Sequence, residues 1–342
     1  MTTHACVSDN HIKYNTVVAF DLDVLLPFHR NDEFLPRAIE SLAEAKGVKF
    51  HAILVDDRED KSINYLKSFA KLSSYQIIET SGNTGYGHSL QLASEYITSD
   101  CVALFNSDDL MHPDRFKIQM KHLLHSDINF TKMIRIGRNG RRKRSLTGTL
   151  ESDKFCILYL LLGSYGANAS WCARSSWWNE NIFFDNFESL DWRIALKTFK
   201  KSVVTYSPEE LYFYRKHGNQ VTNYKKLSRD ALQIIYNSWL DLCLELGLPT
   251  YSYNVFSMLA LPWNRENSIE MNQYLDAVSE IKLLSKTYDF RIQSDIASLI
   301  NRRSILALRS RGGLKSKATL GINGVSSIKG IVEDTVRNGF LG

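Results

Sequence analysis

The chain has 342 residues, of which 44% are hydrophobic and 23% are charged, and its formal net charge is +5. This length allows one large or two medium domains, and the apolar share predicts a globular protein with a substantial core. The excess of 42 Lys and Arg over 37 Asp and Glu is too small to indicate nucleic-acid binding by itself.

The cysteines and the first residues indicate an intracellular protein. Five scattered cysteines form no CxxC pair, which is typical of a reducing compartment rather than of a disulfide framework or a zinc site. The opening MTTHACVSDNHIKYN is polar and lacks the apolar centre of a signal peptide. The longest apolar run, FCILYLLLG at 155–163, is about half as long as a membrane-spanning helix. We therefore expect a cytoplasmic protein, working at most at the inner face of the plasma membrane.

The first part of the chain alternates strand-like and helix-like segments. Apolar runs that end in polar residues predict strands, and apolar residues at helical spacing predict helices between them. In chain order these elements are strands at 23–28, 51–57, 75–80 and 101–106 and helices at 34–46, 61–72 and about 88–98. Repeated strand–helix units of this length predict a mostly parallel sheet with helices on both faces.

Polar residues follow the ends of these predicted strands. The residues gathered at these ends are Pro27 to Arg30, Asp56 and Asp57, Asn83, and Asp108 and Asp109. In parallel α/β sheets, ligands bind beyond the carboxyl ends of the strands. We therefore expect these residues to lie on one rim and to form a site.

The pattern changes after residue 127. A segment that alternates apolar and polar residues contains Asn139-Gly140, a strong hairpin-turn pattern. From about residue 226 onward the pattern is helical. The predicted domains are a catalytic α/β domain at 1–225, with a nucleotide-binding half at about 20–127 and an acceptor half at about 128–225, and a helical region at 226–342.

Two adjacent carboxylates, Asp108 and Asp109, interrupt the stretch VALFNSDDLMHP directly after a buried strand. Their charges repel each other, so something must stabilise them. A divalent cation would do so, and oxygen ligands suit Mg²⁺ or Mn²⁺, whose remaining positions are usually completed by substrate phosphates. The alternative is that the acids cap a helix that begins near Pro113. For the triplet Ser107-Asp108-Asp109 alone, capping is the better interpretation.

Six short motifs in a fixed order change that balance. They are Pro27-Phe28-His29-Arg30 before a helix, Val55-Asp56-Asp57-Arg58-Glu59, Asn83-Thr84-Gly85, Asn106-Ser107-Asp108-Asp109 with Pro113, Leu190-Asp191-Trp192, and Tyr214-Arg215-Lys216-His217. With these motifs, over about residues 21–222, the chain resembles the family 2 glycosyltransferases of the GT-A fold. The resemblance implies a Rossmann-like α/β fold with a mostly parallel central sheet and flanking helices.

The resemblance also implies how a nucleotide-sugar donor is bound. Asp57 would accept a hydrogen bond from the N3–H of a pyrimidine base, and Asn83 would lie beside it. Asp108 would face the ribose or the sugar. The floor under the base would be formed by Pro27, Phe28, His29 and Arg30.

For the chemistry, the resemblance implies a Mn²⁺ or Mg²⁺ ion held by Asp109 and His217. Asp191 would be the general base that deprotonates the acceptor hydroxyl for in-line attack on the anomeric carbon. The apolar stripe that begins at Trp192 independently places Asp191 in the first turn of a helix, where the macrodipole favours the ionised carboxylate. Glu188, three residues earlier, is the rival base.

Five positions depart from the family's pattern. Asn106 replaces the first acid of the usual triplet, and Leu190 stands where an acid usually precedes the base. Arg58-Glu59 replaces Gly-Ser, and Arg30 replaces Asn. These departures leave the acids at 57, 109 and 191 in place but leave the identity of the donor open.

Two basic segments lie outside the motifs. Residues 132–144 hold seven Lys and Arg and no acid, which is typical of a solvated hairpin or of a contact for a diphosphate, an anionic lipid or nucleic acid. Residues 302–317 interleave six basic residues with Ile and Leu, which suits a helix on anionic lipid or a helix in a dimer. We expect peripheral membrane contact through 302–317, no nucleic-acid partner, and a homo-oligomer, if one forms, through the C-terminal helices.

Taken together, the motifs predict a metal-dependent, inverting glycosyltransferase. It would move a sugar from a UDP-sugar to a glycan or lipid-linked glycan acceptor in the synthesis of a bacterial surface polysaccharide. Two alternatives stay open. A sugar-phosphate nucleotidyltransferase would share the acids and the cation but should carry a Gly-rich basic loop near the first strand, where only Arg30 gives a hint. A non-catalytic binding protein could also use a transferase scaffold.

Overall fold

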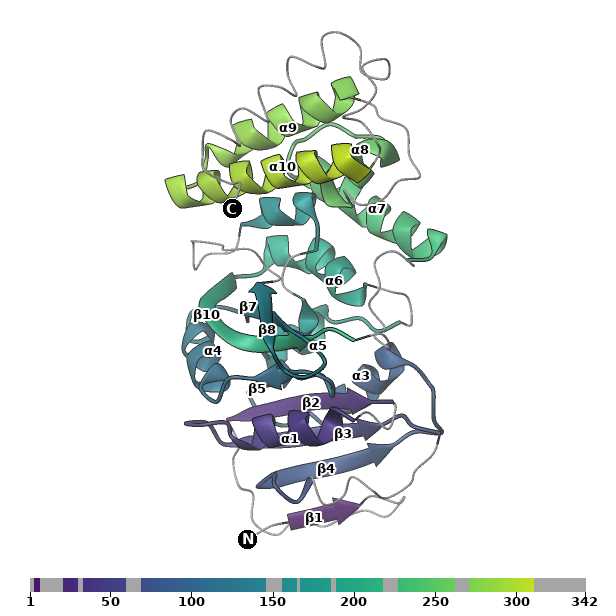
Figure 1. Ribbon diagram of the computed structural model, residues 1–342, viewed down its shortest axis with the longest axis vertical. Helices are drawn as coiled ribbons and strands as arrows, with labels where there is room; N and C mark the ends of the chain where they lie inside the picture. The colour runs from purple at the N-terminus through teal and green to yellow at the C-terminus, as the bar shows by residue number, and fades with distance from the viewer. Residues whose placement is uncertain are drawn as a thin grey trace. The chain divides into compact units, whose positions relative to one another are not determined.

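The computed structural model describes residues 3–6, 21–29, 33–59, 69–145, 156–164, 167–185, 189–217, 227–261 and 271–310 (Figure 1). The strands are β1 (Thr3–Cys6), β2 (Leu22–Phe28), β3 (Phe50–Asp56), β4 (Ser74–Glu79), β5 (Cys101–Leu104), β6 (Leu110–Met111), β7 (Ile128–Ile136), β8 (Arg142–Ser145), β9 (Cys172–Arg174) and β10 (Val204–Arg215). The α-helices are α1 (Leu35–Ala43), α3 (Tyr86–Ser94), α4 (Arg115–Leu123), α5 (Ser175–Asn181), α6 (Leu190–Thr198), α7 (Arg229–Glu245), α8 (Tyr253–Ala260), α9 (Met271–Ser285) and α10 (Phe290–Ser310). Short 3₁₀ helices are η1 (Ile157–Leu162), η2 (Asn168–Ser170) and η3 (Phe199–Lys201).

Within the described residues the strands form one mixed sheet, in the order β1-β4-β3-β2-β5-β9-β7-β10-β6, with β8 beside β7. The strands from β1 to β5 in this order run parallel to their neighbours. The short strand β9 is antiparallel to both β5 and β7, and β10 then runs parallel to β7. The predicted fold class, an α/β sheet with mostly parallel strands and flanking helices, is confirmed.

The core beside the parallel strands follows from the apolar pattern of β2 and α1. Alternate residues of β2 share one face of the sheet, and residues of α1 at helical spacing are buried against the same cluster. These residues are Leu22, Val24, Leu26 and Phe28 on β2, and Leu35, Ala38, Ile39 and Leu42 on α1. Because β2 pairs in parallel with β3, with Phe28 opposite Asp56, the carboxyl ends of the two strands lie side by side.

The predicted elements agree with this structure, apart from their ends. The four predicted strands correspond to β2, β3, β4 and β5, and Asn139-Gly140 turns the antiparallel pair β7 and β8, with φ +79 at the glycine. The predicted helix at 61–72 falls almost wholly outside the described residues. The capping alternative for Asp108 and Asp109 is not observed, because β6 follows them and α4 begins at Arg115 with Asp114 at its N-cap.

The chain divides into two compact units. The sheet belongs to the first unit together with α1, α3, α4 and α5, and the helices α7 to α10 with η1 belong to the second. Helix α6 contributes its residues up to Ile194 to the first unit and the rest to the second. In the described part of the chain, no helix is both long and apolar enough to cross a bilayer. Our assignment of functional domains at 1–225 and 226–342 stays a prediction.

Candidate active site

The loop after β4 closes around the carboxylate of Asp57. Its Oδ1 accepts hydrogen bonds from the Thr80 hydroxyl (2.6 Å), the Thr84 amide (2.8 Å) and the Thr84 hydroxyl (2.7 Å). Its Oδ2 accepts one hydrogen bond, from the Gly85 amide (3.0 Å), and the Asn83 amide donates to the Asp57 carbonyl (2.7 Å). A carboxylate oxygen has two lone pairs, so Oδ2 can still accept the base N–H that the resemblance implies.

These hydrogen bonds make Asp57 a stabilising carboxylate with a defined pH dependence. Burial raises the pKa of Asp57, but the hydrogen bonds to its charged form together lower the pKa by more than burial raises it. The pKa of Asp57 therefore lies below its usual value. The resulting stability is fully present above the unfolded pKa of about 3.9 and is lost as the pH falls through the lower folded pKa. We expect Asp57→Asn to cost about 1–3 kcal/mol of unfolding free energy at neutral pH and to flatten the acid decline in stability.

Urea unfolding across the acid range checks this prediction, with Asp100→Asn as the control because Asp100 is exposed. The control should keep the wild-type decline in stability. An Asp57→Asn protein with that same decline would contradict the assignment.

The turn after β3 explains how the chain tolerates Arg58 where the family has glycine. The Arg58 guanidinium folds back on Asp56, with Nε 2.8 Å from Oδ1 and Nη2 2.6 Å from Oδ2, and lies 5.4 Å from the centre of the Phe28 ring. A glycine is needed nearby instead. Gly82 has φ +93, and a Cβ there would lie 2.9 Å from the Glu59 Cα. The loop after β4 and the turn after β3 therefore approach each other closely beside Asp57, the predicted contact of the nucleobase.

The predicted floor of the donor site is only partly accessible. Pro27 and Phe28 are buried, and the Phe28 ring packs against Phe69 with centroids 5.9 Å apart. His29 is half-buried, and its Nδ1 lies 2.9 Å from the Asp57 carbonyl oxygen. Of these three residues, His29 is the one whose side chain is not fully buried. Arg30 lies outside the described residues.

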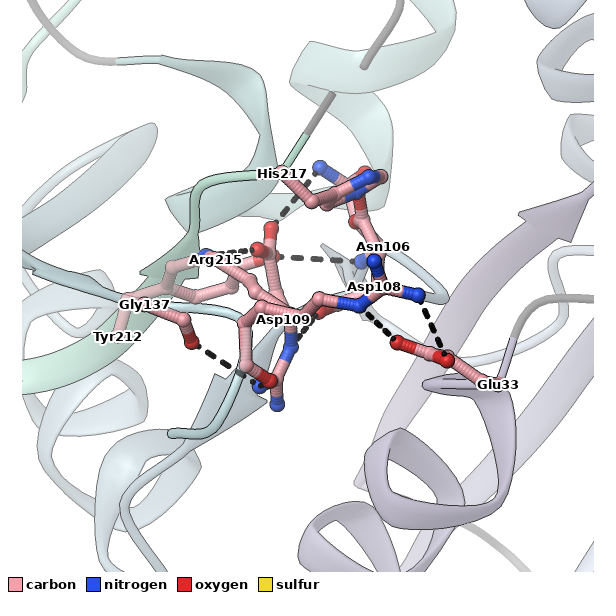
Figure 2. Close-up of polar contacts among 9 residues, drawn as sticks. Glu33, Asn106, Asp108, Asp109, Gly137, Tyr212, Arg215 and His217 are labelled. Carbon is pink, nitrogen blue, oxygen red and sulfur yellow. Dashed lines mark hydrogen bonds and ion pairs between the residues drawn. The ribbon is translucent and has the colours of Figure 1, made fainter. Parts of the chain in front are cut away.

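The carboxylate of Asp109 is fully enclosed by protein donors (Figure 2). Its Oδ1 accepts from the Arg215 amide (2.7 Å), and its Oδ2 accepts from the Tyr212 hydroxyl (2.7 Å) and from Asn106 Nδ2 (3.2 Å). Burial, followed by the negative charge of Asp108, raises the pKa of Asp109 well above its usual value. The departure at Asn106 thus supplies a donor where a third acid would add repulsion.

Asp108 is oriented differently and meets His217. Its Oδ2 lies 2.9 Å from His217 Nε2, and its side chain is 21% exposed (Figure 2). The His217 ring packs against Phe34, with centroids 5.0 Å apart, and so has a fixed place above the strand ends. The two adjacent carboxylates therefore have separate environments, which reduces the cost of placing them side by side.

Arg215 connects these acids to the antiparallel pair β7 and β8, which is called the basic hairpin below. Its Nε donates to the Asp108 carbonyl (2.8 Å), and its Nη1 donates to the carbonyls of Arg138 (2.9 Å) and Gly137 (3.4 Å). The guanidinium also lies 4.6 Å from the centre of the Phe34 ring. Arg215 belongs to the last of the six motifs but had no predicted role, and its side chain links the Asp108 backbone to the hairpin turn.

The pair of Asp108 and His217 fits part of a divalent-cation site. Two ligands at a right angle, each about 2.1 Å from one ion, are about 3 Å apart, close to the observed 2.9 Å. Among the described residues, no three His, Cys, Asp or Glu side chains form a metal-binding cluster. Mg²⁺ sites that substrate phosphates complete usually have only one or two protein carboxylates, so a contribution of two protein ligands is compatible with such a site.

Asp191 lies in the first turn of α6, as predicted. Its carboxylate accepts hydrogen bonds from the Trp192 amide (2.8 Å) and from the Asn168 amide. Burial nevertheless raises the pKa of Asp191, so the expected effect of the helix dipole is outweighed. Trp192 is buried and belongs to the core. The rival base, Glu188, lies outside the described residues.

The basic hairpin carries an open hollow. The hollow has a volume of about 480 Å³ and is lined by Gly137, Arg138, Asn139, Arg141 and Lys143. Arg138 forms a two-point ion pair with Glu33, with Nε 2.7 Å and Nη2 3.0 Å from the carboxylate oxygens. The hairpin is therefore joined both to the segment before α1 and, through Arg215, to the acid pair.

Backbone strain marks the two sides of this site. In the described part of the chain, the non-glycine residues with positive φ are Asn83 (φ +52) and Ser189 (φ +57). Asn83 belongs to the loop around Asp57, and Ser189 directly precedes α6 and its Asp191. Such conformations cluster at functional sites because the surrounding structure must hold them.

A sheet with acids at the ends of its parallel strands, a further acid at the start of a helix and a histidine after the last long strand has the organisation of a GT-A transferase. The model of the family described as Glycosyl transferase family 2 matches residues 23–200, over half of the chain. The chain therefore belongs to this family and is a glycosyltransferase.

Solved structures of S. aureus TarS share the fold. TarS 1–349 in complex with UDP-GlcNAc superposes with a TM-score of 0.56 at 16% identity, over 93% of this chain and 92% of that chain. TarS 1–349 in complex with UDP gives 0.54 at 15% identity, with the same coverage. A further TarS structure gives 0.52 at 16% identity, over 92% of this chain and 55% of that one. No curated protein matches the chain.

Proposed function

We propose that the chain transfers a sugar from a uridine diphosphate donor to a glycan acceptor, with a divalent cation and with inversion at the anomeric carbon. One observation carries the proposal: Asp108 Oδ2 and His217 Nε2 lie 2.9 Å apart at the strand ends. This pair is suited to hold the cation that accompanies a diphosphate. Asp57 is suited to bind the nucleobase, and Asp191 is suited to deprotonate the acceptor hydroxyl. The nucleotide is taken from the TarS complexes, which contain UDP-GlcNAc and UDP.

The geometry favours an exchange of roles between the two adjacent acids. In this proposal Asp108 and His217 hold the cation, and Asp109 anchors them through Tyr212 and Arg215. The reason is that Asp108 is partly exposed, whereas both oxygens of Asp109 already accept hydrogen bonds in a fully buried position. When bound, Mn²⁺ or Mg²⁺ would act as a Lewis acid on the negative charge of the departing UDP.

Asp191 takes the proton of the acceptor hydroxyl in this proposal. The acceptor oxygen then forms a bond to the anomeric carbon as the bond from that carbon to the diphosphate oxygen breaks on the opposite face. The configuration inverts, and the proton stays on Asp191. A raised pKa makes Asp191 a stronger base than an exposed aspartate, which supports this role.

The acceptor and its location extend the same proposal. A lipid-linked glycan of a surface polysaccharide would be reached from the cytoplasmic face of the membrane. The hollow at Arg138 to Lys143 is a contact for an anionic group of such an acceptor. Helix α10 includes residues 302–310 of the basic segment, for which we propose peripheral contact with anionic lipid. A homo-oligomer through α7 to α10 stays a prediction.

Calorimetric titration of the purified protein tests the donor assignment. The panel is UDP-glucose, UDP-galactose, their N-acetylhexosamine counterparts and GDP-mannose, each with Mn²⁺ and with EDTA. We expect one UDP-sugar to bind, and its affinity to fall about tenfold or more without the cation, because the diphosphate then loses its counter-charge. Preference for GDP-mannose would overturn the base assignment, and binding of no donor in either condition would overturn the transferase proposal.

A further inference from the structure

Tyr86 is close enough to three acids of the site for their charges to act on its hydroxyl. It is the first residue of α3 and directly follows the loop that closes around Asp57. Its side chain is half-buried. Besides burial, the charges of Asp191, Asp108 and Asp109 raise the pKa of Tyr86, which places its hydroxyl within electrostatic reach of all three.

Asn168 ties the Tyr86 hydroxyl to the candidate base. The Asn168 side-chain Nδ2 donates to the Tyr86 hydroxyl oxygen (3.2 Å), and the Asn168 backbone amide donates to the carboxylate of Asp191. Asn168 is the first residue of η2, so both donors belong to one short, ordered turn. Asn168 therefore bonds to both the Tyr86 hydroxyl and the Asp191 carboxylate.

The hydrogen of the Tyr86 hydroxyl is left for a ligand. Its oxygen accepts from Asn168, and among the described residues no acceptor takes the hydrogen of this hydroxyl. A tyrosine hydroxyl can accept one hydrogen bond and donate another at the same time. A hydroxyl that accepts from the protein and keeps its own hydrogen to donate is therefore suited to bind an oxygen of the substrate.

We propose that the Tyr86 hydroxyl donates a hydrogen bond to a hydroxyl oxygen of the sugar that is transferred, and that Asn168 is the positioning residue that aligns this contact with Asp191. The inference rests on the proposed function, in which the sugar lies between the diphosphate at Asp108 and the base at Asp191. Tyr86 is near both of these carboxylates, whereas the nucleotide part of the donor is assigned to Asp57. The contact would hold the anomeric carbon in line between the base and the leaving group.

The test is a comparison of two ligands on one variant. Tyr86→Phe removes the hydroxyl and keeps the ring, so the fold should be retained, and thermal unfolding monitors this. The matched control is Tyr96→Phe, because Tyr96 lies just after the same helix and is 37% exposed. Each protein is titrated in Mn²⁺ with UDP alone and with UDP-glucose, UDP-galactose and their N-acetylhexosamine counterparts.

We expect Tyr86→Phe to bind UDP within about twofold of wild type and to bind the preferred UDP-sugar about 3- to 10-fold more weakly, the effect of one lost hydrogen bond. Tyr96→Phe should change neither affinity. Equal weakening of UDP and of the UDP-sugar, or weakening of neither, would overturn the inference. A wild-type protein that binds neither UDP nor any UDP-sugar would instead overturn the proposed function, so the two failures are distinguishable.

Discussion

Replacing Asp191 with asparagine should lower the rate of sugar transfer by about 10²- to 10⁴-fold, the usual contribution of a positioned general base. Asparagine keeps an oxygen that can accept from the Trp192 and Asn168 amides, so the first turn of α6 should be retained. Donor affinity should stay near wild type, because Asp191 acts on the acceptor hydroxyl. Release of UDP from the donor, measured beside donor titration, separates the two effects.

The control for this prediction is the rival base. Glu188→Gln should leave the rate within about twofold of wild type, since the proposal gives Glu188 no proton to move. A slow Glu188→Gln protein with an active Asp191→Asn protein would transfer the role of base to Glu188.

The pH dependence of the wild-type rate follows from the same assignment. A base acts only when deprotonated, and burial raises the pKa of Asp191. The rate should therefore fall as the pH decreases through a pKa above that of an ordinary aspartate, about 3.9. Asp191→Asn should lose this acid limb.

Replacement of Asp108 should lower activity with little effect on stability, whereas replacement of Asp109 should lower stability. Asp108→Asn should lower kcat/KM in Mn²⁺ by about two orders of magnitude, equivalent to the several kcal/mol of charge stabilisation that a catalytic cation supplies. Its stability should change little, because the side chain is partly exposed. Asp109→Ala should instead destabilise the fold by at least about 2 kcal/mol, because it removes the acceptor of the Tyr212 hydroxyl and the Arg215 amide.

Urea unfolding and Mn²⁺-dependent donor titration of both variants check this contrast. Loss of the response to Mn²⁺ in a stable Asp109→Ala protein, together with an Asp108→Asn protein that still responds to Mn²⁺, would reverse the two roles.

Arg215→Lys serves as a third variant. It keeps a positive charge near the Asp108 carbonyl but cannot form the forked contact, so it should weaken Mn²⁺ binding less than Asp108→Asn does.

The sequence was sufficient to predict which residues lie at the strand ends, because each strand end is specified by a short stretch of sequence. Each strand is an apolar run that ends in polar residues, and parallel strands bring those ends to one edge of the sheet. Asp57 and Asp108 follow directly from this rule, and Asp191 follows from the helical stripe of α6. The family resemblance then supplied His217, which no periodicity places.

The different orientations of the Asp108 and Asp109 side chains could not be predicted, because they are set by residues far away in the sequence. Which carboxylate turns inward depends on Tyr212 and Arg215 in β10. Tyr86 and Asn168 were missed for a similar reason: neither belongs to a charged motif, and their contact joins α3 to η2 across 82 residues. For Asp191, the helix dipole was a correct local consideration, but burial, a property of the whole fold, outweighs it.

The most direct test of the account is the structure of the chain in complex with UDP and Mn²⁺. We expect the ion to contact Asp108 and His217, with Asp109 still bonded to Tyr212 and Arg215. The uracil base should lie against Asp57. An ion bound to Asp109 with those hydrogen bonds broken, or UDP bound away from the strand ends, would contradict the account.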